Sequence, residues 1–236
     1  QHNEKVFFNG EFRVSQEFSP ELWNPVTGEI RYLPDFKSKK GYISLPVELE
    51  GNESAFIVFR KTNKVTEKKD NFPQKAIVYK IDTPWKITFE AGKRGPKTPV
   101  VWSQLKDWMD SENDSIKYFS GQAVYETTFT LEKLPQKSLY IDLGNVMVMA
   151  KVTLNGHYVG GVWINPYRLN VTDYLREGEN KLEITVVNNW QNRLIGDQRL
   201  PEDQRLTWTT INPWKADSSL QSSGLLGPVE IQFFDY

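Results

Sequence analysis

Aromatic and polar side chains gather between residues 163 and 197, and together they could bind a carbohydrate. A sugar ring needs a flat aromatic face for its C–H side and a few polar groups for its hydroxyls. The candidate carbohydrate-binding or interface residues of these types are Trp163, Tyr167, Arg168, Trp190, Asn192, Arg193 and Asp197. Packing is the alternative for the aromatic members. Tyr167 alternates with Leu169 and Val171, which indicates a core position, and Trp163 and Trp190 could cover a sheet edge.

The segment from Asn192 to Asp203 combines side chains that suit an interface. Arg193 has a planar guanidinium that pairs well with a carboxylate, and Leu194 and Ile195 supply an apolar anchor beside it. Such a mixture suits an interface core with a polar surround, so we expect this segment to dock against another domain. The polar stretch 207–223 that follows, which includes Trp208, predicts a long surface loop that could carry binding.

Few residues could hold a metal ion. The chain has no Cys and only two His, which excludes thiolate and His-rich sites. Asp197, Glu202 and Asp203 offer oxygen ligands, but their spacing is not that of a regular calcium loop. We therefore predict no metal or cofactor, with a structural calcium ion as the alternative.

Composition sets the broad class. The 236 residues are 39% hydrophobic, so the chain can bury one large core or two smaller ones. A net charge of -1 gives no sign of a nucleic-acid or anionic-membrane partner, and we expect neither nucleic-acid binding nor membrane insertion.

Apolar residues at period two place these side chains on strands. The runs 118–131, 139–143, 147–154, 157–163, 167–171 and 182–186 predict antiparallel strands, and Asn155-Gly156 is a strong hairpin signal. One short helix, over 104–109, is expected with Ser103 as its cap. No long helices alternate with the strands, so a Rossmann fold or (β/α)₈ barrel is excluded. The class predicted is an all-β, antiparallel sandwich.

The first quarter of the chain reads as a second, smaller set of strands. Asn9-Gly10 predicts a hairpin, and residues 55–60 are apolar on both faces, as in a central strand. The polar run that follows favours a linker. The predicted organisation is a partial β-sandwich over 1–62, a linker over 63–75 and a larger sandwich over 76–236.

Several motifs in the larger sandwich resemble a known family. The segments 152–156, 166–168, 171–175 and 178–182 look like the sugar-binding jelly roll of family 2 glycoside hydrolases, also called galactose-binding-domain-like. The segments 116–121, 190–197, 200–203 and 223–229 resemble, more narrowly, the C-terminal region of bacterial α-L-rhamnosidases of glycoside hydrolase family 106. The resemblance implies a jelly roll that follows a catalytic barrel, with the catalytic carboxylates and a calcium site in that barrel. It also implies a secreted or periplasmic protein.

The expected function follows from this resemblance. Glycoside hydrolysis generally needs two carboxylates across the scissile bond, and nothing in the spacing of the acidic residues marks such a pair, so no catalytic residue is predicted. We expect a non-catalytic accessory region that braces the catalytic domain of a carbohydrate-degrading enzyme and could bind sugar. The alternatives are a free-standing carbohydrate-binding module and a protein-interaction or adhesion sandwich.

Overall fold

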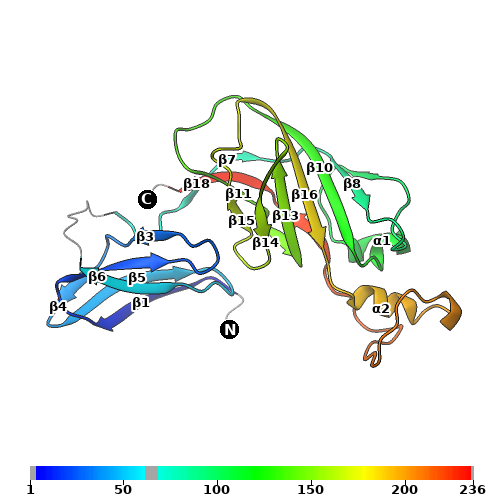
Figure 1. Ribbon diagram of the computed structural model, residues 1–236, viewed down its shortest axis with the longest axis horizontal. Helices are drawn as coiled ribbons and strands as arrows, with labels where there is room; N and C mark the ends of the chain where they lie inside the picture. The colour runs from blue at the N-terminus through cyan, green and yellow to red at the C-terminus, as the bar shows by residue number, and fades with distance from the viewer. Residues whose placement is uncertain (1–3, 62–68, 235–236) are drawn as a thin grey trace. The chain divides into compact units, whose positions relative to one another are not determined.

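The computed structural model describes residues 4–61 and 69–234, which form two compact units (Figure 1). The first comprises the described residues up to Ala76, with 164–166 and Phe234, and the second comprises Ile77–Trp163 and Tyr167–Phe233. Antiparallel strands dominate both units, so the predicted all-β class is confirmed. Among the described residues, no helix is long and apolar enough to cross a membrane.

Part of the predicted linker, 63–68, lies outside the described residues. Of the remainder, Asn71 is buried, and its side-chain amide exchanges hydrogen bonds of 2.9 and 2.8 Å with the backbone of Asp35. The linker boundaries stay a prediction.

The first unit contains two three-stranded sheets, ordered β1-β5-β4 and β3-β2-β6. Their strands are β1 (Val6–Arg13), β2 (Phe18–Trp23), β3 (Ile30–Tyr32), β4 (Lys37–Lys39), β5 (Tyr42–Leu49) and β6 (Phe56–Lys61). The buried core is small and consists of Leu22, Leu33, Ile43, Leu45 and Val47.

Two predictions for this unit are wrong. Asn9 and Gly10 form no turn, because β1 runs straight through them and pairs with β5 along its whole length. The run 55–60 does not become a central strand, because β6 pairs with β2 at the edge of its sheet and Phe56 is 62% exposed. In both cases the position of the neighbouring strand, which local sequence does not encode, decided the outcome.

The second unit is a sandwich of a six-stranded sheet, ordered β14-β13-β16-β10-β8-β9, and a four-stranded sheet, ordered β15-β11-β18-β7, with the pair β12-β17 beside them. The strands are β7 (Lys75–Lys80), β8 (Trp85–Phe89), β9 (Val100–Trp102), β10 (Gln122–Leu131), β11 (Leu139–Asp142), β12 (Asn145–Met147), β13 (Met149–Leu154), β14 (His157–Val162), β15 (Arg168–Asn170), β16 (Gly178–Val187), β17 (Gly224–Gly227) and β18 (Glu230–Phe234).

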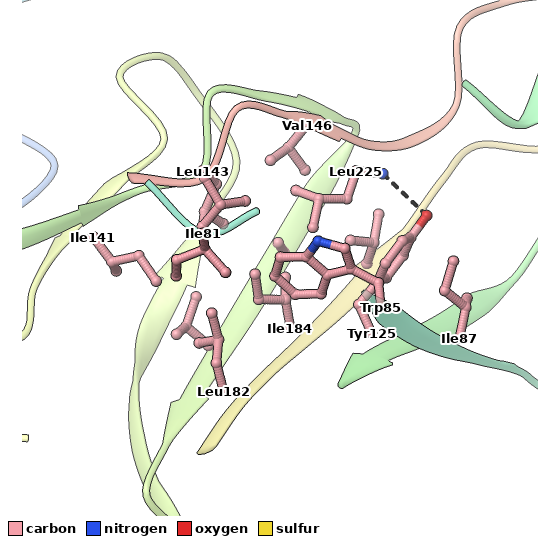
Figure 2. Packing of buried hydrophobic residues seen from close by; sticks show 14 of the residues in the cluster. Ile81, Trp85, Ile87, Tyr125, Ile141, Leu143, Val146, Leu182, Ile184 and Leu225 are labelled. Carbon is pink, nitrogen blue, oxygen red and sulfur yellow. Dashed lines mark hydrogen bonds between the residues drawn. The ribbon is translucent and has the colours of Figure 1, made fainter. Parts of the chain in front are cut away.

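The long pair β10 and β16 forms the centre of the larger sheet, in register from Gln122 opposite Val187 to Leu131 opposite Gly178. Alternate side chains of these strands point into the sandwich, and Figure 2 shows Tyr125, Leu182 and Ile184 packed there. The predicted alternation is therefore confirmed. The strand predicted from 118 begins later, because residues Asp114–Lys117 form the short helix α1 and β10 starts at Gln122.

The Asn155-Gly156 hairpin between β13 and β14 is confirmed. Both residues have positive φ, 53° and 84°, as the tight turn requires. The strand predicted over 147–154 is interrupted at Val148, which is 37% exposed between β12 and β13.

The helix predicted over 104–109 is wrong. A single 3₁₀ turn, η1 (Trp108–Asp110), forms instead, and its cap is Asp107, whose carboxylate accepts hydrogen bonds from Met109 N and Ser223 N. Ser223 lies 116 residues away in sequence, so a tertiary contact selected this cap. Trp108 is fully buried and donates its indole N–H to Tyr125 Oη at 2.6 Å.

Beyond β16 the chain leaves the sandwich as the helix α2 (Gln191–Asp197), followed by a long loop that contains the 3₁₀ turn η2 (Glu202–Gln204). In Figure 1 this part extends from one end of the sheets before the chain returns to β17. We call residues 198–221 the projecting loop.

Candidate functional site

A shallow groove of about 630 Å³ lies on the outer face of the six-stranded sheet. Most of its polar lining comes from outward-facing positions of β8, β10, β13 and β16, which alternate with the core positions of the same strands. The side chains that give it chemical character are Lys86, Glu126, Thr128, Thr153, Lys181 and Glu183. The lining contains no aromatic ring, so the groove lacks the flat face on which a sugar stacks.

Charges in the groove balance one another across the strands. Glu126 sits opposite Lys86 on one side and opposite Glu183 on the other, and Lys86 Nζ lies 2.9 Å from Glu126 Oε2. Thr153 of β13 completes the row beside Glu183. The groove is a nearly neutral surface with a pair of neighbouring carboxylates and apolar side chains such as Val101 and Leu182 in its lining.

A buried ion pair lies within α2. Arg193 Nη2 is 2.8 Å from Asp197 Oδ1, one helical turn away, and the two residues are 7% and 1% exposed. Burial lowers the pKa of Arg193, and the nearby charge of Arg94 lowers it further, whereas Asp197 acts in the opposite direction. Glycine at 196 leaves room for this pair, because a Cβ there would lie 2.7 Å from both the Arg193 guanidinium and the Tyr118 side chain.

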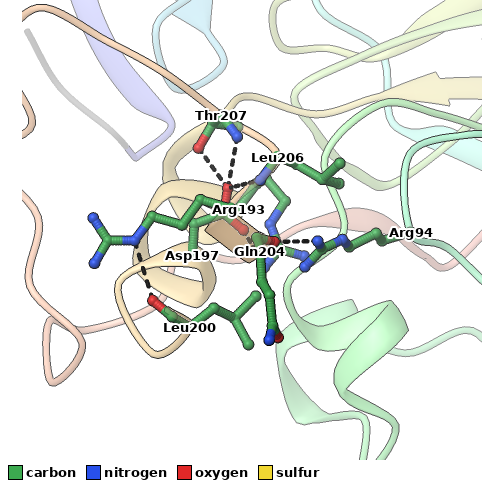
Figure 3. Close-up of polar contacts among 8 residues, drawn as sticks. Arg94, Arg193, Asp197, Leu200, Gln204, Leu206 and Thr207 are labelled. Atoms are coloured by element: carbon green, nitrogen blue, oxygen red, sulfur yellow. Dashed lines mark hydrogen bonds and ion pairs between the residues drawn. The ribbon is translucent and has the colours of Figure 1, made fainter. Parts of the chain in front are cut away.

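The second oxygen of Asp197 holds the projecting loop. Oδ2 accepts hydrogen bonds from Leu206 N at 3.0 Å, Thr207 N at 2.8 Å and Thr207 Oγ1 at 2.6 Å (Figure 3). Asp197 thus links the helix, through Arg193, to Leu206 and Thr207 of the projecting loop. A carboxylate that accepts several such bonds is a strong brace.

Asn192 holds the returning end of the same loop. Its amide nitrogen donates to Gln221 O at 2.6 Å and to Ser223 Oγ at 3.2 Å, while its oxygen accepts from Gln221 N at 2.8 Å. Asn192 is 1% exposed. Its polar atoms are bonded within the chain, and the ion pair between Arg193 and Asp197 is likewise internal.

The structure therefore separates the predicted site residues into different environments. Trp163 and Trp190 are 59% and 60% exposed and available for contact. Tyr167 packs against the core as the packing alternative proposed, and burial raises its pKa. Arg168 lies on β15 with its guanidinium 5.7 Å from the centre of the Tyr140 ring. The role of all these residues in binding stays a prediction.

The segment 192–203 is buried in its first half and exposed at residues 201–203, and its docking role stays a prediction. Asn192, Arg193, Ile195 and Asp197 are buried within the second unit, and part of the expected loop is the helix α2. The geometry does not favour the calcium alternative either, because Asp197 is engaged by Arg193 and the loop. Among the residues that the structure describes, no group of three or more His, Cys, Asp or Glu side chains could hold a metal ion.

The candidate set omits the apolar side chains that the projecting loop exposes. Leu206, Trp208 and Ile211 are 44%, 86% and 79% exposed. The polar composition of residues 207–223 predicted the loop, but it did not show which of the large apolar side chains nearby would face outward.

Comparison with known proteins relates this arrangement to enzymes that act on carbohydrates. Residues 102–220 match the family model for the glycosyl hydrolase 2 galactose-binding domain-like domain. A candidate beta-glucuronidase of Formosa agariphila is 44% identical over 158 residues, which are 56% of this chain and 14% of that protein.

A solved structure matches almost the whole chain. The rhamnosidase from Novosphingobium sp. PP1Y is 36% identical, with a TM-score of 0.85 over 98% of this chain and 22% of that one. The chain therefore spans less than a quarter of the length of either relative.

Proposed function

The chain belongs to the glycosyl hydrolase 2 galactose-binding domain-like family, and from that premise we propose that it is a non-catalytic accessory region of an α-L-rhamnosidase-like glycoside hydrolase. One observation carries the proposal: both units together match one portion of a rhamnosidase that is several times longer. In this role the chain braces a catalytic domain that is encoded in the same gene.

The chemistry of the described residues supports a non-catalytic role. A glycosidase holds a sugar between two available carboxylates. In the groove, Glu126 is engaged by Lys86, and no ring is present to hold the substrate. Asp197 is buried and accepts three hydrogen bonds.

Two experiments test the proposal. The genomic reading frame should continue beyond this chain into a catalytic domain, and a frame confined to these residues would refute the accessory role. The 236-residue chain should release no aryl group from aryl α-L-rhamnosides or aryl β-D-glucuronides, whereas the whole gene product should. Turnover by the chain that is lost in Glu126→Gln or Glu183→Gln would instead assign catalysis to the groove.

A carbohydrate-binding module is the second candidate, favoured by the exposure of Trp163 and Trp190. Exposed indoles can stack on sugar rings. Calorimetry with rhamnose-containing oligosaccharides should then show binding that Trp163→Ala or Trp190→Ala weakens. Flat titrations across a broad glycan panel would end this candidate.

Secretion or periplasmic localisation forms part of the proposal, since a polysaccharide-degrading enzyme meets its substrate outside the cytoplasm. Fractionation of the source cells tests it, and recovery of the native protein in the cytoplasmic fraction alone would count against it.

A further inference from the structure

We propose that Leu206, Trp208 and Ile211 form an anchor that inserts into an apolar pocket of the catalytic domain of the same glycoside hydrolase. The inference rests on the proposed function and adds the contact through which the accessory region acts. It starts from the exposed fractions of these three side chains on the projecting loop, which are 44%, 86% and 79%.

Several polar side chains close to the anchor hold the loop itself. Thr207 Oγ1 donates to Asp197, Thr209 Oγ1 donates to Ile211 O at 3.1 Å, and Asn212 Oδ1 accepts from Trp214 N at 3.0 Å. These three groups are thereby bonded within the chain, although other polar side chains of the loop, such as Glu202 and Asp203, remain exposed. What this part of the loop offers to a partner is mainly apolar.

The loop is also fixed before any partner arrives. Three arginines donate hydrogen bonds to backbone carbonyls of the loop. Arg94, which lies outside the loop, donates to Gln204 O. Within the loop, Arg205 Nε donates to Leu200 O at 3.2 Å and Arg199 Nε donates to Ala216 O at 3.3 Å. Figure 3 shows Arg94 reaching Gln204 beside the Asp197 contacts. A loop ordered in advance loses little conformational entropy on binding, which favours affinity.

The neighbours of Trp208 favour a protein pocket over a sugar. A sugar site places hydrogen-bonding groups beside the ring, to bind hydroxyls. Here Leu206 and Ile211 lie two and three residues away in sequence, and the nearby Thr207 and Thr209 hydroxyls are already engaged. Tryptophan is enriched among the residues that dominate binding at the centre of protein interfaces, and charged residues such as Glu202 and Asp203 can form its polar rim.

The proposed partner also accounts for what covers the anchor. The rhamnosidase that matches 98% of this chain has more than three quarters of its length outside the match. A domain in the same polypeptide is held at high effective concentration, so a contact of only a few side chains is sufficient to keep it docked.

Covalent footprinting of tryptophan tests the proposal on the 236-residue chain and on the whole gene product. In the chain, oxidation should modify Trp208 and Trp163 readily, because they are 86% and 59% exposed. In the whole protein, the Trp208 rate should fall roughly tenfold, as expected for an anchor in a desolvated pocket, while Trp163 serves as the reference exposed tryptophan. Trp208→Ser should lower the melting temperature of the whole protein but leave that of the chain unchanged.

Each other outcome contradicts the docking proposal. Equal oxidation of Trp208 in both proteins refutes it while leaving the accessory function intact, provided that the reading frame encodes a catalytic domain. If rhamnose-containing oligosaccharides protect Trp208 from oxidation in the isolated 236-residue chain, the anchor binds sugar instead. Protection that rises with chain concentration, together with dimers in sedimentation, would assign it to a second copy. A reading frame without a catalytic domain removes the proposed function and the docking proposal together.

Discussion

Replacing Asp197 by Ala should destabilise the second unit strongly, because it leaves Arg193 without its ion-pair partner. Arg193 is 7% exposed, and its Nε has no hydrogen-bond acceptor in the described part of the chain. The 2.8 Å pair with Asp197 is therefore the main compensation for burying the guanidinium. Removing one partner of a buried pair typically costs about 3–5 kcal/mol.

The cost should lie near the lower end of that range, at about 3 kcal/mol, since the donors that Asp197 releases can reach water. Leu206 is exposed and Thr207 is half-buried, so their backbone N–H groups can be hydrated when the loop opens. For a unit of this size, that loss corresponds to a melting temperature lower by roughly 10 °C.

Tryptophan fluorescence during urea unfolding measures the effect. All tryptophans except Trp23 lie in the second unit, so the signal reports mainly on it. Asp203→Ala, at an exposed position of η2, is the matched control and should change stability by less than about 0.5 kcal/mol. The double variant Arg193→Met/Asp197→Leu should recover most of the loss, because apolar residues can replace a buried pair.

A loss below about 0.5 kcal/mol in Asp197→Ala would refute the reasoning, since it would mean that Arg193 is not dependent on this carboxylate. A large loss has a further consequence. It would identify the Arg193–Asp197 pair as an internal brace, and the docking role predicted for residues 192–203 would fail.

Two further perturbations probe the core of the second unit. Tyr125→Phe should cost about 1–3 kcal/mol in urea unfolding, because the buried N–H groups of Trp108 and Leu225 lose their shared acceptor. Burial raises the pKa of Tyr125 above its ordinary 10.0, so the phenol ionises at lower pH in the unfolded chain than in the folded one. The stabilisation that comes from this pKa difference is fully present below about pH 10. It is lost as the pH rises toward the pKa of the folded state. Stability should therefore fall less steeply between about pH 9 and 11 in Tyr125→Phe than in the parent, and identical slopes would contradict this. Gly224→Ala should cost about 3 kcal/mol, since a Cβ there would lie 2.5 Å from Trp108 Nε1 at a φ of +100°. Gly156→Ala, with a φ of +84° and no atom within 4 Å, should show only the backbone strain of about 1 kcal/mol in the same urea unfolding experiment.

Features that depend on neighbours along the chain were predictable from the residue pattern. Period-two alternation identified the inward faces of β10 and β16, because successive side chains of a strand point to opposite sides. Asn155-Gly156 predicted its hairpin because the two residues tolerate positive φ. The motifs of the family lie in this same part of the chain, so the class of the sandwich was predictable.

Features that depend on distant segments were not predictable in this way, because they form only in the folded chain. Asn9-Gly10 has the same local preference for a turn, yet β5 pairs straight across it and keeps it extended. Asp197 reads as one more acidic residue in a polar stretch until the fold surrounds it with Arg193 and the loop backbone. The exposure of Trp208 has the same origin, because contacts such as that of Arg94 with Gln204, 110 residues apart, fix which side of the loop faces outward. Local composition cannot encode such contacts, since they form only when the sandwich brings both segments together.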